Sequence, residues 1–462
     1  MSAAAPSVTV ISGCAIATVD AQSSEYPTGH LVVENGRIVA VGAGPAAASW
    51  RERATRWVDG AGLLATPGFV NTHHHLYQWI TRGYAQDETL FGWLTSLYPV
   101  WAGIDEETVE AGAAANLGWM ALSGTTLTTD HHYVFPQAGG DVLGATIESA
   151  RTIGLRFHPT RGSMDLGTSS GGLPPESVVQ ATDVALEATE AAIKRWHDPA
   201  PDSMLQIAVA PCSPFSVTKE LMTGAAEIAR AHGARMHTHL CETLDEEAFC
   251  LEKYGRKPGE YVEDLGWLGP DVWFAHVVWP TKEDIARFAA TGTAVAHCPT
   301  SNARLGSGIA PVADMLAAGV PVGLGVDGSA SNESGRMDDE LHQALLVARL
   351  RGGSTSMSAR QVLSMATMGG ARVLGRQQDL GSLEVGKLAD IALWRVDGVS
   401  GVDIADPVCA LVFGTRSQLE LLLVGGVPIV EQEQLVRADI GDLAARSGAA
   451  SAALAKRAGL TR

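Results

Sequence analysis

The sequence predicts an α/β fold, a (β/α)8 barrel of the TIM type, joined to a small β-rich domain. Two observations predict the barrel. Short apolar runs such as LLATPGFV and VWFA alternate with Ala- and Glu-rich stretches of helical periodicity, which is typical of parallel strands joined by crossover helices. Residues able to bind a metal follow several of these runs in order along the chain, and a barrel brings the carboxyl ends of its strands to one mouth.

The β-rich domain is predicted from both ends of the chain. Residues 7–66 hold short apolar stretches between Gly, Asn and Asp turns, and Asn35-Gly36 favours a type I′ hairpin. SLEVGKLADIALWRV and ELLLVGGVPIVEQ near the other end have the same character. We therefore predict one composite β-sandwich from residues 1–67 and 381–462, the latter with a closing helix, and a metal-dependent barrel over residues 68–380.

Helices of the barrel are expected where apolar residues recur three and four positions apart. The clearest candidates are residues 105–124, 176–197, 218–233 and 281–292. Three of these stretches end on Gly, as helix C-termini often do.

Composition limits the class of partner. The net charge of −18 argues against nucleic acid and anionic membranes, which would repel the protein. No apolar run reaches the ~20 residues of a membrane helix. The six cysteines form no CxxC pair, and the first residues lack the basic and apolar regions of a secretory signal. We expect a cytoplasmic protein.

A histidine cluster after the first predicted barrel strand indicates a metal site. In an extended chain, side chains two positions apart share a face, so His73 and His75 can bind one ion while His74 points away. Buried paired histidines are often simple core residues, but further candidates follow here. His237 and His239 form a second such pair, and spacing alone leaves open which one is a ligand.

The remaining candidates are two carboxylates and a further histidine. Glu242 follows His239 by three positions, His276 ends the run VWFA, and Asp327 lies in GVDG, where it could also be a turn residue. Neutral imidazoles with a carboxylate suit Zn²⁺ or Fe²⁺. Such an ion lowers the pKa of a water toward ~7, and a carboxylate takes the proton. No lysine is placed to bridge two metals, which favours one ion.

The motifs PGFVNTHHH, THLCET, FAHVVW, GLGVDGSASN and GSLEVGKLADIAL resemble the amidohydrolase superfamily, in its deaminase and chlorohydrolase branch. The resemblance implies a distorted (β/α)8 barrel with a composite β-sandwich. It also implies His73, His75, His239 and Asp327 as ligands of one divalent ion, Zn²⁺ before Fe²⁺. Glu242 is then the proton shuttle and His276 polarises or orients water and substrate, with Asp327 as the second acid/base. The same resemblance implies a homodimer.

A finer resemblance rests on HHHLYQ, LFGWLTSLYPVWA, TTDHHYVFP, TRGSMDLG and APCSPFSVT, which are similar to bacterial 8-oxoguanine deaminases. It implies hydrolytic deamination of 8-oxoguanine to urate and ammonia. The s-triazine hydrolases share HLYQ and the WL…LYP region, but the triazine dechlorinase has Asn where this chain has Gly328. Guanine, isocytosine and pterins are alternative amine substrates. A non-catalytic scaffold relative is disfavoured, because every ligand position and Glu242 are intact.

Three residues are predicted to contact the heterocyclic substrate. Gln78 offers a donor and an acceptor, and Arg161, expected just after a strand, could bond a ring oxo group. Trp93, expected in a loop, could stack on the base. Each has an alternative role: Gln78 as a helix cap, Arg161 as partner of an acidic neighbour, and Trp93 as a core aromatic.

Overall fold

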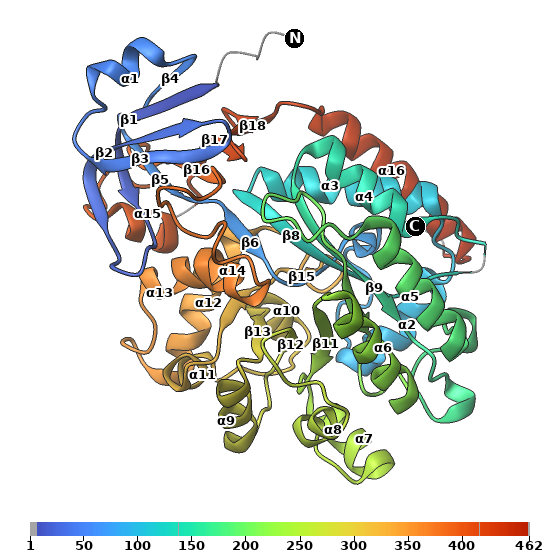
Figure 1. The fold of residues 1–462 in the computed structure, drawn as a ribbon. Helices are drawn as coiled ribbons and strands as arrows, with labels where there is room; N and C mark the ends of the chain where they lie inside the picture. The colour runs from blue at the N-terminus through green and yellow to red at the C-terminus, as the bar shows by residue number, and fades with distance from the viewer. Residues whose placement is uncertain (1–6, 137, 415, 461–462) are drawn as a thin grey trace.

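The computed structural model describes residues 7–136, 138–414 and 416–460, and it contains the predicted barrel with a β-rich layer beside it (Figure 1). Eight parallel strands follow one another around the barrel: β6 (Phe69–Asn71), β8 (Thr125–His132), β9 (Arg156–Ser163), β10 (Ala208–Pro211), β11 (Met236–Leu240), β12 (Val272–His276), β13 (Ala294–His297) and β14 (Val322–Leu324). The ring closes where the Thr72 amide donates to the Leu324 carbonyl at 2.9 Å.

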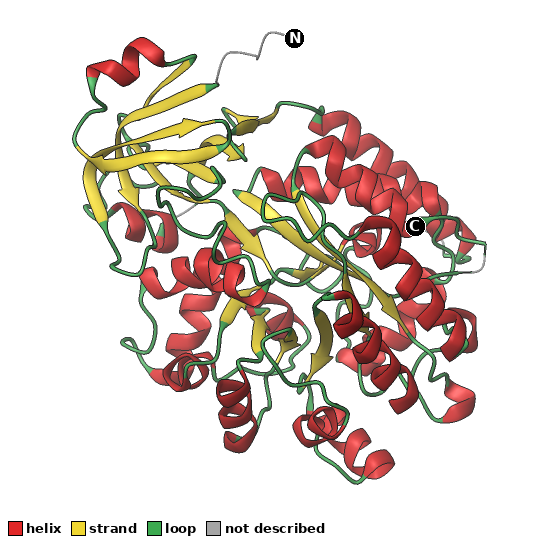
Figure 2. Ribbon diagram, in the orientation of Figure 1, coloured by secondary structure: helices red, strands yellow, loops and turns green. Residues whose placement is uncertain are grey.

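Helices surround these strands (Figure 2). The larger ones are α2 (Leu90–Trp101), α3 (Glu106–Ala121), α4 (Val142–Ile153), α5 (Thr182–Trp196), α6 (Lys219–His232), α7 (Leu244–Tyr254), α9 (Lys282–Thr291) and α12 (Met337–Gly352). Helices α3, α6 and α9 confirm three predicted stretches. In the fourth predicted stretch, 176–197, residues 176–178 form only a 3-10 turn, and α5 begins at Thr182. Gly233 and Gly292, both with positive φ, end α6 and α9 as expected.

Shorter elements complete the barrel domain. They are the 3-10 segment η1 (Leu76–Thr81), α8 (Pro258–Asp264), α10 (Pro299–Arg304), α11 (Val312–Ala318), α13 (Ala359–Ser364), α14 (Gly370–Val373), and the two-residue strands β7 (His74–His75) and β15 (Asp327–Gly328). Helix α15 (Pro407–Phe413), from the C-terminal part of the chain, packs on α12 and α13. Strands β7 and β15 pair with each other at the mouth. This pairing draws the first and last strands of the barrel together where the candidate ligands lie.

Both ends of the chain form one sheet. Its strands are β1 (Val8–Ala17), β2 (Glu25–Glu34), β3 (Arg37–Ala43), β4 (Arg56–Asp59), β5 (Leu63–Pro67), β16 (Ile391–Arg395), β17 (Gln418–Val424), β18 (Val427–Glu431) and β19 (Gln434–Leu435), with α1 (Ala48–Arg53) before β4. Antiparallel pairing of β5 with β16 joins the two halves. Asn35 and Gly36 both have positive φ between β2 and β3, as the predicted type I′ hairpin requires.

The closing helix is α16 (Ile440–Arg457), and it packs on the barrel helix α3 (Figure 1). The Asp439 carboxylate caps its first turn by accepting from the Asp442 amide at 2.9 Å. The division at residues 67/68 and 380/381 stays a prediction.

Within the described ranges, no helix combines the length and apolar character that crossing a membrane requires. All six cysteines are free thiols, and only Cys409 is less than fully buried. The first six residues of the expected non-secretory start lie outside the described residues.

Candidate active site

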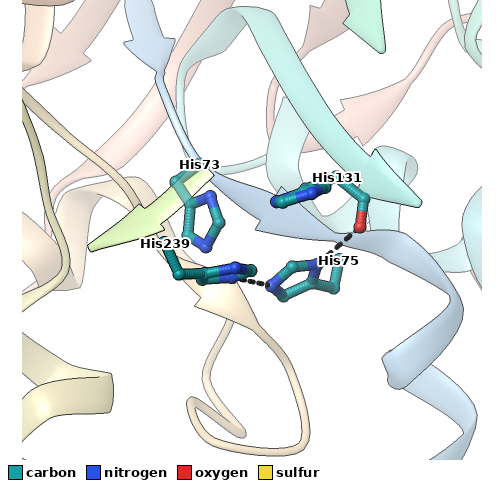
Figure 3. Close-up of side chains that lie close together, drawn as sticks. All are labelled: His73, His75, His131 and His239. Carbon is teal, nitrogen blue, oxygen red and sulfur yellow. Dashed lines mark hydrogen bonds between the residues drawn. The ribbon is translucent and has the colours of Figure 1, made fainter. Parts of the chain in front are cut away.

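The predicted metal ligands meet at the carboxyl ends of the strands. His73 follows β6, His75 lies in β7, and His239 lies in β11, with the imidazoles turned toward one another (Figure 3). The Nε2 atoms of His75 and His239 are 3.1 Å apart. Asp327 Oδ1 lies 3.2 Å from His73 Nε2 and 3.3 Å from His75 Nε2. All four side chains are buried.

Backbone carbonyls set the protonation of two of these rings. His75 Nδ1 lies 2.7 Å from the His131 carbonyl, and His239 Nδ1 lies 2.6 Å from the Cys212 carbonyl. A carbonyl only accepts, so each Nδ1 carries the proton and donates it. The lone pair of each ring therefore lies on Nε2, the atom that faces the other histidines.

His237 and His239, which the spacing did not distinguish, differ in their hydrogen bonds. His237 Nδ1 lies 2.9 Å from the Trp273 carbonyl and must donate to it. Its Nε2 then accepts from His73 Nδ1 at 2.8 Å, which leaves the lone pair of His73 on Nε2. His237 thus orients His73 from behind, whereas His239 points into the cluster.

This donor set fits a divalent metal ion. Three imidazoles direct lone pairs at one point beside a carboxylate, and the buried His73 Nε2 has no hydrogen-bond partner in the described part of the chain. Burial lowers the pKa of His73 and of His239 well below the ordinary value, which keeps both rings neutral. Neutral imidazole and carboxylate are the ligands that zinc prefers in catalytic sites.

His74 points away from this point. Its Nδ1 donates to the Asp327 carbonyl at 2.6 Å, and its Nε2 accepts from the Asn116 amide at 2.7 Å. Through these two bonds it ties β7 to β15 and to α3.

Glu242 and His276 face each other across the site. Glu242 Oε2 lies 3.6 Å from His276 Nε2, and Glu242 Oε1 is buried without a hydrogen-bond partner among the described residues. His276 Nε2 also lies 3.9 Å from Asp327 Oδ2. Burial, then the Asp327 and Glu246 charges, raises the pKa of Glu242 well above its ordinary value. A carboxylate in this state readily holds a proton.

Several supporting residues were not identified from the sequence. Helix α10 places Ser301, whose hydroxyl donates to Asp327 Oδ2 at 2.6 Å, next to Asn302, whose Oδ1 accepts from His276 Nδ1 at 2.9 Å. His131 joins the histidine cluster, with its Nδ1 buried and without a partner in the described ranges (Figure 3). The only signal for α10 was the polar run PTSNA after an apolar strand.

A narrow cavity of about 30 Å³ adjoins the cluster. Its walls are formed by His75, Gln78, Leu90, Trp93, Leu94, Tyr98, Tyr133, Cys212, Ser213, Phe215, His239, Glu242, His276, Leu305, Asp327 and Ser331. Neither end of the buried Gln78 amide, nor the Tyr98 hydroxyl, makes a hydrogen bond within the described part of the chain. Aromatic and aliphatic side chains with a few unpaired polar groups among them are typical of the wall of a small-molecule site.

Of the three predicted substrate contacts, the structure brings two to this cavity. Gln78 lies there in η1. Trp93 also lines it, but from α2 rather than from the expected loop, and its indole donates to the Ala330 carbonyl at 3.2 Å. Arg161 does not line it. Arg161 lies inside β9 instead of after it, and two of its guanidinium donors already bind Gln180 and Gly162, with the group over the Phe135 ring.

A parallel barrel with a buried His and Asp cluster at its mouth and a carboxylate beside it defines a metal-dependent hydrolase. The model of the amidohydrolase family matches residues 64–427. The chain belongs to this family.

Individual relatives agree with this assignment. An 8-oxoguanine deaminase from Pseudomonas aeruginosa is 44% identical, covering 92% of this chain and 95% of that protein. An isoxanthopterin deaminase of an unknown prokaryote is 36% identical over 84% of each chain. A crystal structure of an Arthrobacter aurescens atrazine chlorohydrolase in complex with zinc superposes with a TM-score of 0.90 at 36% identity, covering 96% of this chain and 100% of that one. Zinc is thus bound by a relative of the same fold.

Proposed function

We propose that this protein deaminates an amino-substituted purine by hydrolysis, with 8-oxoguanine as the substrate and urate and ammonia as products. The observation that supports it best is the buried Gln78 amide, unpaired in the described part of the chain, in the wall of the cavity that Glu242 also lines. An amide can form two hydrogen bonds to an N–H and C=O edge, which 8-oxoguanine has and a chlorotriazine lacks. The similarity to an 8-oxoguanine deaminase, which covers nearly the whole length of both chains, agrees with this proposal.

The proposed ligands of the ion are His73, His75, His239 and Asp327. When bound, a divalent ion lowers the pKa of a water molecule toward ~7. Glu242 takes a proton from this water and delivers it to the ring nitrogen beside the carbon that bears the amine. His276 orients the water, since its Nε2 lies between the two carboxylates.

Asp327 then takes the second water proton and passes it to the leaving amine. By this point the oxygen of the water has bonded to the ring carbon that bears the amine. The bond between this carbon and the amine nitrogen then breaks, and ammonia leaves. The Ser301 hydroxyl donates to Oδ2 of Asp327, and this hydrogen bond keeps the carboxylate in place during the transfer.

The glycine at position 328, Gly328, favours an oxopurine over a triazine as the substrate. A Cβ at this position would lie 1.8 Å from Gln78 Oε1 and 2.4 Å from its Cδ. Any larger residue at 328, including the Asn of the triazine dechlorinase, would therefore displace the Gln78 amide from its present place. Hydrolysis of an s-triazine is the second candidate, because the superposition with a chlorohydrolase favours it.

The test is ammonia release by metal-loaded protein given 8-oxoguanine, guanine, isocytosine, isoxanthopterin and a chlorotriazine in parallel, with chloride followed for the last. We expect rapid ammonia release from 8-oxoguanine and little from guanine. No ammonia from any amine would overturn the purine assignment, and chloride release would move the protein to triazines.

We also propose that the protein is a cytoplasmic homodimer. Six free thiols are typical of a reducing compartment. Light scattering of the purified protein and fractionation of cells test the two statements separately.

A further inference from the structure

Glu246 is a buried carboxylate that binds the backbone amide of Glu242 and that of the residue before it. It lies in the first turn of α7 and is fully buried. Its Oε1 accepts from the Cys241 amide at 2.9 Å and its Oε2 from the Glu242 amide at 2.8 Å. No lysine or arginine forms an ion pair with it in the described ranges, so a carboxyl group is buried here at a cost that no positive charge offsets.

A comparison with α9 separates this arrangement from ordinary helix capping. There Asp284 bonds the amide and hydroxyl of Thr281, the cap residue itself, and pairs with Arg287 at 2.8 Å. This is the usual capping box, with its acid neutralised. In α7 the cap residue Thr243 accepts from the Glu246 amide at 3.2 Å. The Glu246 side chain reaches further back, to the two residues that precede the cap.

The backbone held by Glu246 is in a conformation that it would not keep unaided. Cys241 has a φ of 54°, in the left-handed region that costs a non-glycine residue about 1–3 kcal/mol. Its carbonyl accepts from the amides of Val278 and Trp279, both at 2.9 Å. The turn after β11 is thus fastened on one side to Glu246 and on the other to the segment that follows His276.

We propose that Glu246 is a positioning residue that aims the Glu242 carboxylate at His276 and at the reacting water. This inference rests on the proposed role of Glu242 as proton shuttle. Glu246 does not touch the substrate cavity; it acts through the two amides, which set where the Glu242 side chain begins. A glutamine at 246 keeps the volume but replaces one acceptor with a donor, which faces an amide N–H and cannot bond it.

The experiment compares Glu246→Gln with Asp284→Asn, a matched change of a buried helix-start acid whose hydrogen bonds go to Thr281 and Arg287 and not to the backbone of Cys241 or Glu242. Both variants are purified with metal, and kcat, KM, zinc content and melting temperature are measured with the amine substrate that the wild type accepts. We expect Glu246→Gln to lower kcat by about 10- to 100-fold, the scale of a misplacement of about 1 Å. KM should change less than threefold and zinc should be retained. Asp284→Asn should lower only the melting temperature.

A wild-type kcat in folded, metal-loaded Glu246→Gln would overturn the proposal, as would a fall in the melting temperature with no change in kcat. If this variant does not fold, Glu246→Asp replaces it: it keeps the charge but falls one methylene short of the two amides, and an unchanged kcat would again overturn the proposal. If instead the proposed role of Glu242 were wrong, the Glu242→Gln variant would stay active whatever residue stands at 246, and this result distinguishes the two failures.

Discussion

The two ends of the barrel differ in how their buried polar groups are paired. At the amino-terminal end, Arg156 binds both oxygens of Asp390, at 2.8 and 3.2 Å, and Asp390 also accepts from the Gly425 amide at 2.7 Å. At the carboxyl end, Glu242 Oε1 and the Gln78 amide have no partner among the described residues. The Arg156 and Asp390 pair fastens the barrel to the β-sheet, whereas the Glu242 and Gln78 atoms are available for a ligand.

Three residues at the mouth have a strained backbone. Cys241, His276 and Asp327, all at the mouth, have φ values of 54°, 72° and 62°. Left-handed conformations of non-glycine residues persist only where the surroundings enforce them, and they gather at functional sites. We therefore expect changes at the mouth to alter turnover, and changes to the Arg156 and Asp390 pair at the opposite end to alter stability.

The largest effect is expected from the histidine pair at the mouth. His239→Ala removes a proposed ligand, so metal content and ammonia release should both fall to background. His237→Ala removes only the support of His73, so zinc affinity should fall by about 10- to 100-fold while the metal-saturated enzyme stays active. Metal analysis and zinc titration of both variants check this. If His237→Ala lost metal outright and His239→Ala kept it, the assignment of the pair would be reversed.

Glu242→Gln should lower kcat by about 10²- to 10⁴-fold, because an amide cannot take the proton of the water. Zinc content should equal that of the wild type, since Glu242 is not among the proposed ligands. Steady-state kinetics with metal analysis measure both. Substantial turnover would remove Glu242 from the mechanism and would weaken the contrast between the two ends.

Asp390→Ala tests the opposite end. It leaves the buried Arg156 without its counter-charge, which should lower the free energy of unfolding by about 3–5 kcal/mol. Chemical denaturation measures this loss, and kcat per folded molecule should stay at the wild-type value. A variant of normal stability and impaired turnover would contradict the division of roles.

The smallest effect is expected at Gly328. Gly328→Ala places a methyl group where the Gln78 amide lies, so two substrate hydrogen bonds should weaken and kcat/KM should fall by about 10- to 100-fold. In a Gln78→Ala background the same change should add little, because the amide is already gone. Gly448→Ala on α16, where the added Cβ meets open space, is the control. Additive losses at 78 and 328 would show that the two residues act separately.

Much of the fold and part of the site could be predicted because their signals are local. Alternation along an extended strand predicts that His73 and His75 share a side and that His74 does not. Asn35-Gly36 specifies its hairpin through the φ values that these residues tolerate. The 176–197 stretch was predicted too long because periodicity does not mark where Thr182 begins the helix, and boundaries are the weakest part of such predictions.

Sequence patterns were enough to predict the barrel, the β-rich layer from both ends, and the residue types that follow the strands. The three-dimensional arrangement was needed to see which histidine of the His237 and His239 pair faces the cluster, that Arg161 lies outside the cavity wall, and that Glu246 binds the turn of Glu242. Periodicity and turn chemistry act between neighbours in the chain. A hydrogen bond such as that between His73 and His237, 164 positions apart, depends on where whole strands are placed.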